Sequence, residues 1–111
     1  MSEPKSIAHV VLLQSGPDEP VSNDPLLESL VDRLANLATT HGAVAEHAGR
    51  NRAPESFTGG FSHGFVATFP DVAALDSYLR APAHDGLVLE MNSLHLGALV
   101  LDLIVREKEA P

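Results

Sequence analysis

The sequence contains no cysteine and has few basic residues, seven Lys and Arg against fifteen Asp and Glu. Without cysteine the chain can form neither a disulfide framework nor a thiolate site. The net charge of −8, with no basic cluster beyond Arg50 and Arg52, indicates that nucleic acid is not a partner. There is no apolar run of about 18 residues and no signal-peptide core at the N-terminus, so we expect a cytoplasmic protein that does not enter membranes.

Aromatic residues are also scarce: four Phe, one Tyr and no Trp. The position of each aromatic residue on a predicted buried face is therefore worth noting. A length of 111 residues with 44% hydrophobic residues predicts one domain, 1–111, with an ordered core at about 7–105.

The first half of the chain predicts a strand, a helix and a weaker strand. Residues 7–14 are apolar on both faces, as in a strand that is covered on both sides. Asp24 and Pro25 are typical of a helix N-cap and first position, and His41 followed by Gly42 is typical of a helix end. Residues 43–49 form the weaker strand, because they contain few β-branched residues.

The second half predicts a strand at 61–69, a helix after Asp71, and a break at Pro82. Another helix follows up to Gly97, and then a last strand at 98–105. Along this second helix one apolar stripe includes a histidine: His84, Leu87, Val88 and Met91.

The resulting order, β-α-β-β-α-β, predicts an α+β, ferredoxin-like fold with a four-stranded antiparallel sheet and helices on one face. The other face should also be apolar, and an uncovered apolar face requires a partner. We therefore expect two copies to pair face to face as a homodimer. The residues assigned to the uncovered face are Val10, Leu12, Val66, Val100 and Ile104.

Several motifs, spread over residues 7–105, together resemble the stress-responsive α/β-barrel family (Dabb). The resemblance implies a dimeric α/β barrel. It rests on His9 before an apolar strand, Gly49-x-Asn51, Gly60-Phe61-Ser62-His63-Gly64-Phe65, Tyr78-x-x-x-Pro82-x-His84, and Asp102 in the last strand.

The resemblance also implies a possible chemistry, because the family includes relatives of a polyketide cyclase. By that likeness His84 would be a general base and Tyr78 a substrate-binding partner. The chain departs from the common pattern in two places: the first strand runs into Gln14-Ser15-Gly16-Pro17 instead of a Lys-Phe pair, and Ala81 replaces a histidine.

Strand and helix periodicity predicts a cleft between sheet and helices with apolar walls and a few polar tips, which is typical of small-molecule sites. There His84 would take a proton from an activated carbon, and Tyr78 would donate a hydrogen bond to the developing enolate. We expect such an aldol or Claisen ring closure to need no cofactor. We also expect no metal, because the six histidines show no local metal-ligand spacing. The remaining predicted ligand-binding residues are His9, Val11, His63, Phe65, Leu87 and Met91.

Two other interpretations stay open. The cleft could bind a small apolar or aromatic molecule with no reaction assigned to it. Alternatively, the protein could be a non-enzymatic, stress-associated dimer in which the His84 ring bonds a backbone carbonyl beside the Pro82 break.

Overall fold

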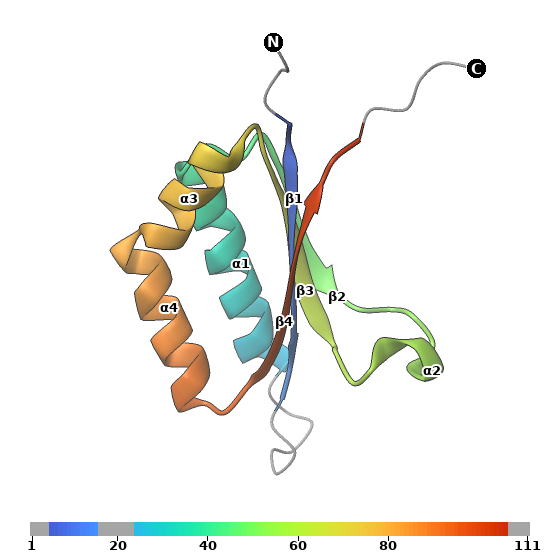
Figure 1. Cartoon of the computed structure of the whole chain (residues 1–111). Helices are drawn as coiled ribbons and strands as arrows, with labels where there is room; N and C mark the ends of the chain where they lie inside the picture. The colour runs from blue at the N-terminus through green and yellow to red at the C-terminus, as the bar shows by residue number, and fades with distance from the viewer. Residues whose placement is uncertain (1–4, 16–23, 107–111) are drawn as a thin grey trace, which may run out of the picture.

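The computed structural model describes residues 5–15 and 24–106, and Gly16 and Pro17 lie outside this part (Figure 1). The four strands form one sheet in the order β2-β3-β1-β4, and every neighbouring pair is antiparallel. Helices α1, α3 and α4 cover one face (Figure 1). This confirms the predicted ferredoxin-like α+β fold. The elements are β1 (Ile7–Gln14), α1 (Asp24–Thr40), β2 (Ala45–Arg50), α2 (Glu55–Thr58), β3 (His63–Phe69), α3 (Val72–Arg80), α4 (Pro82–Ser93) and β4 (Gly97–Ile104).

Three local signals for helix ends are confirmed, those at Gly42, Asp71 and Pro82. Gly42 has a φ of 101°, a left-handed conformation that stops α1. Asp71 caps α3, because its carboxylate accepts a hydrogen bond of 2.9 Å from the Ala74 amide. Ala81 is extended, with φ −64° and ψ 134°, as expected for a residue before proline, and α4 begins at Pro82.

Several boundaries differ from the sequence prediction. Strand β2 spans Ala45–Arg50 rather than 43–49, and β4 spans Gly97–Ile104 rather than 98–105. The short helix α2 lies inside a segment that was predicted to be a loop. Strand β3 begins at His63 rather than Phe61, because Gly59 and Gly60 have φ values of 60° and 90° and turn the chain just before it. Helix α4 ends at Ser93, well before Gly97, since the amides that follow bond back to the last turn and His95 becomes left-handed at a φ of 56°.

The pairing of β1 with β4 corrects the assignment of the uncovered face. His9 lies opposite Asp102 and Val11 opposite Val100, and directly opposed residues share a face. Val100 and Ile104 therefore lie on the helix side of the sheet, so their placement on the uncovered face was wrong. The large apolar residues on the uncovered face are Val10, Leu12, Val66, Leu99, Leu101 and Leu103.

The core lies between the sheet and the helices. It is built mainly from the buried side of α1 and from the alternate residues of β1 and β3 that face it. Tyr78, Phe65 and Phe69 are the largest fully buried side chains. No helix within residues 5–15 and 24–106 is long and apolar enough to cross a membrane.

Candidate functional site

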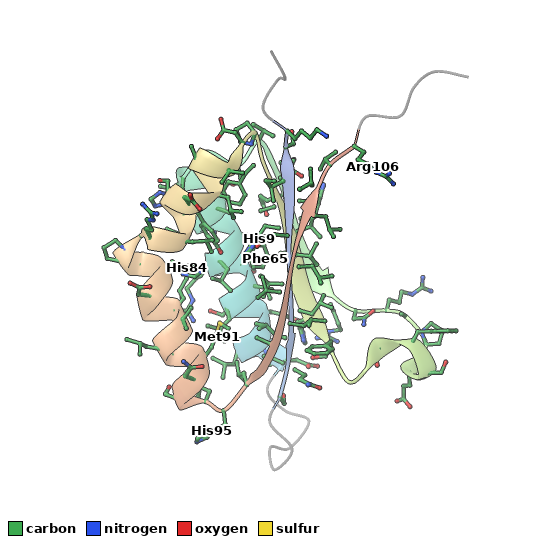
Figure 2. The ribbon with its side chains drawn as sticks, viewed as in Figure 1. His9, Phe65, His84, Met91, His95 and Arg106 are labelled. Atoms are coloured by element: carbon green, nitrogen blue, oxygen red, sulfur yellow. The ribbon has the colours of Figure 1, made fainter. Side chains whose placement is uncertain are left out.

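Three polar aromatic side chains meet in the apolar layer between sheet and helices. Tyr78 comes from the last turn of α3 and His84 from the first turn of α4, so the break at Pro82 brings them together at 4.8 Å between ring centroids. His9 comes from the middle of β1, and its ring centroid lies 5.5 Å from that of Tyr78. Figure 2 shows His9 on the helix side of the sheet and His84 on α4 facing it.

These three residues line a cavity of about 120 Å³. Of the residues predicted from the sequence to bind a ligand or act on it, five lie here. The full lining is His9, Val11, Leu34, Tyr78, Leu79, His84, Val88, Met91, Ala98 and Val100. The cavity is therefore an apolar chamber with polar groups contributed by His9, Tyr78 and His84.

His9 is held by a carboxylate on the neighbouring strand. Its Nδ1 lies 2.5 Å from Oδ1 of Asp102; His9 is 2% exposed, whereas the Asp102 side chain is 38% exposed. A neutral His9 that donates from Nδ1 to this carboxylate keeps its lone pair on Nε2. Sequence reasoning did not place Asp102 in the site, although it is the only charged residue in the apolar segment 98–105 and this signal was available.

Two polar atoms beside the cavity lack a partner. Within the described part of the chain, the Tyr78 hydroxyl and Nδ1 of His84 are buried and accept or donate no hydrogen bond. The His84 ring also makes no bond there to a backbone carbonyl, so the structural role considered for it at the Pro82 break gains no support. Buried polar atoms of this kind normally have a partner.

Burial sets the protonation of both groups. Burial raises the pKa of Tyr78, so the phenol stays protonated at neutral pH and can donate a hydrogen bond. Burial also lowers the pKa of His84, the nearby His9 lowers it further, and Asp85 has a smaller opposite effect. His84 is therefore a neutral imidazole near pH 7, the form that accepts a proton.

Three predicted ligand-binding residues lie outside the cavity. Phe65 packs behind it, with its ring centroid 5.8 Å from that of His9. Leu87 lines a different groove, because it lies about 60° around α4 from His84, on the side toward α1. His63 lies near the start of α1, where its Nε2 is 3.9 Å from both Asp24 Oδ1 and Glu28 Oε1.

Three larger hollows lack the combination of His9, Tyr78 and His84. The groove between α1 and α4 has a volume of about 500 Å³ and is crossed by the exposed pair Arg33 and Glu90. A second hollow, about 320 Å³, lies over Gly49 and Gly64 on the uncovered face of the sheet. A third, about 510 Å³, is lined by mostly polar residues of α1 and β2. In the ranges 5–15 and 24–106, no three His, Cys, Asp or Glu residues are grouped so as to hold a metal ion. The smaller cavity is the candidate site, since it combines a base, a donor and apolar walls.

Comparison with solved structures gives relatives of the same fold. A dimeric ferredoxin-like protein of unknown function from Jannaschia sp. is 28% identical, with a TM-score of 0.67 over 90% of this chain and 99% of that one. A hypothetical Arabidopsis thaliana protein solved in solution is 26% identical, with a TM-score of 0.69 over 99% and 97%. A hydroxynitrile lyase from Passiflora edulis is 19% identical, with a TM-score of 0.72 over 96% and 99%.

No curated protein matches the chain. The family model described as the stress responsive A/B barrel domain matches residues 7–105, almost the whole described structure and every residue of the cavity. The chain therefore belongs to the stress responsive A/B barrel domain family.

Proposed function

We propose that this protein is a homodimer that binds a small apolar or aromatic molecule in the cavity beside His84. The observation that carries the proposal is the pair of partnerless buried polar atoms, the Tyr78 hydroxyl and His84 Nδ1, at an otherwise apolar chamber. A ligand with one carbonyl or hydroxyl group would satisfy them, while its apolar part would contact Val11, Val88 and Met91.

The size of the cavity limits the ligand. An engineered cavity of about 150 Å³ holds benzene. A chamber of about 120 Å³ therefore accommodates a molecule of benzene size or slightly smaller, and a linear tetraketide exceeds it. Among the alternatives, this favours a compact substrate over the polyketide implied by the family resemblance.

The dimer is supported by the uncovered face of the sheet. Leu99, Leu101 and Leu103 are 43%, 43% and 53% exposed there, beside Val66 at 38%. An apolar face of this kind is the usual mark of an interface. The Jannaschia relative is described as dimeric, which agrees with this interpretation.

A second candidate function is cofactor-free acid–base catalysis at the same cavity. The neutral imidazole of His84 would remove a proton next to a carbonyl, and the Tyr78 phenol would donate a hydrogen bond to the oxygen on which charge develops. His9, held by Asp102, would take up or return the proton through Nε2. The hydroxynitrile lyase among the relatives supports a lyase on this fold. A purely structural dimer would leave the two partnerless polar atoms unexplained.

Small carbonyl compounds no larger than benzene provide the test. We expect acetone, butanone or cyclopentanone to raise the melting temperature and to shift amide resonances of α4 and β4. His84→Asn should abolish this response, while the matched His95→Asn should keep it, because His95 is exposed and asparagine tolerates its positive φ. Wild-type protein that responds to none of these compounds, or a His84→Asn variant that responds fully, would contradict the proposal.

A further inference from the structure

The segment between β2 and β3 folds into a closed arm, defined here as residues 51–62, on the side of the sheet opposite the helix layer (Figure 1). Asn51 closes its base: its amide donates to the Ser62 carbonyl at 2.7 Å, its side chain donates to the Phe61 carbonyl at 2.9 Å, and its Oδ1 accepts from the Ala53 amide at 2.9 Å.

The segment that returns from α2 to β3 is also fixed. Gly59 and Gly60 take left-handed conformations, and a Cβ on Gly60 would lie 2.5 Å from Oε1 of Gln14, so the arm rests closely on the end of β1. The Thr58 hydroxyl bonds both the Glu55 carbonyl and the Gly60 amide. The arm is therefore a projection held in one conformation by its own hydrogen bonds and by contact with β1.

This projection presents an aromatic ring to solvent. Phe57 is 83% exposed, the highest value among the large apolar side chains in the described ranges. Holding a phenylalanine outward on a hydrogen-bonded arm gives the monomer no packing energy, and it exposes apolar surface that would be favourable to bury.

A complementary apolar surface exists on the same chain. Strand β4 is at the edge of the sheet and is exposed on both faces: Leu101 and Leu103 on the uncovered face, and Ile104, 63% exposed, on the other. At the opposite edge, β2 instead carries polar residues such as Glu46, His47 and Arg50. Within the described sheet, β4 is thus the apolar rim.

We propose that in the homodimer Phe57 of each copy packs against the exposed apolar side chains of β4 of the other copy. The inference rests on the proposed homodimer and specifies which parts of the two copies are in contact. The arm stands on the side where a second sheet would lie (Figure 1). Each chain carries both the ring and the receiving strand, so one two-fold axis satisfies both contacts at once.

The contact would connect the interface to the candidate site. Ala98 and Val100 of β4 line the cavity, and Asp102 of the same strand holds His9. A partner's arm on β4 therefore supports the strand that forms one wall of the cavity. A second copy, rather than an unrelated protein, is the occupant that supplies this contact symmetrically.

The equilibrium test is sedimentation of Phe57→Ala beside the matched control Leu89→Ala, which removes a similarly exposed side chain from the outer side of α4. We expect the dimer Kd of Phe57→Ala to rise about a hundredfold or more, because each dimer loses two buried aromatic side chains. Leu89→Ala should keep the wild-type Kd.

The positional test uses the absence of cysteine in the chain. A benzophenone maleimide attached to Phe57→Cys should give a light-induced covalent dimer whose cross-link maps to β4 of the other copy, and the same label on Leu89→Cys should not. A wild-type protein that is monomeric throughout would refute the proposed dimer together with the arm contact. A dimer whose Kd is unchanged by Phe57→Ala, or a cross-link that maps elsewhere, would refute the arm contact alone.

Discussion

Removing the hydroxyl group of Tyr78 should make the protein more stable. The side chain is fully buried, and its hydroxyl has no hydrogen-bond partner in the described structure. A buried polar group without a partner costs about 1–3 kcal/mol. Tyr78→Phe keeps the ring contacts with His9, Phe69 and His84 while it removes this cost. We expect the free energy of unfolding to rise by about 1 kcal/mol.

Urea denaturation and calorimetry of the ligand-free protein measure this change. For a domain of about 100 residues, 1 kcal/mol corresponds to roughly 4–8 °C in melting temperature. The same variant should bind small carbonyl compounds more weakly, because it has lost the donor. Phe69→Leu changes a ring that packs against Tyr78 but removes no polar group, so it should only destabilise the protein.

The sign of the change distinguishes two roles for the residue. Increased stability together with weaker binding indicates a hydroxyl kept for a ligand. If Tyr78→Phe instead lowered the free energy of unfolding by a similar amount, the hydroxyl would have a protein partner, and the reasoning behind the candidate site would be wrong.

Four further predictions concern other positions. The pKa of His84 is lowered in the fold, so the unfolded chain binds more protons; stability should fall as pH drops from about 7 through 6.5, and denaturation of His84→Gln at pH 7.5 and 5.5 should show a smaller fall. Asp102→Asn should weaken ligand binding and change the ring nitrogen shifts of His9, which loses its carboxylate; unchanged shifts would contradict the pairing. Gly64→Ala should destabilise by about 1–3 kcal/mol, because its Cβ would lie 2.7 Å from the Val11 carbonyl oxygen. Gly86→Ala, within α4 and with nothing within 4 Å, should stabilise by up to about 1 kcal/mol in the same denaturation assay.

The parts of the fold that depend on local chemistry could be predicted from the sequence. The Asp71 cap, the stop at Gly42 and the break before Pro82 each arise from the backbone preference of one or two residues. The helix periodicity also placed His84 and Met91 on the side of α4 that faces the sheet, as both line the cavity. These features need no knowledge of distant contacts.

The incorrect predictions concern positions that are set by pairing between strands far apart in the sequence. Strand β4 is apolar on both faces, so its pattern alone cannot tell which residues face the helices; the pairing with β1 decides, and a shift of one residue exchanges the faces. For the same reason no local pattern indicated that Asp102 contacts His9, 93 positions away, although a single charge in an apolar strand marked Asp102 as unusual. Leu87 and His63 were assigned to the right layer but not to the cavity, because a shared layer does not fix which neighbours a side chain meets.

The candidate site differs from the rest of the core because it contains buried polar side chains where apolar ones would fill the space. Leucine or phenylalanine at positions 9, 78 and 84 would fill the layer without buried polar atoms, yet the chain places two histidines and a tyrosine there, and within the described residues only His9 has a charged partner, Asp102. Local inconsistency of this kind is typical of functional sites. Asp102, Val100 and Ala98 all belong to β4, the strand to which we assign the partner's arm. If both proposals hold, ligand binding and dimer formation are linked through this strand. Any factor by which the dimer tightens ligand binding must then equal the factor by which ligand tightens the dimer.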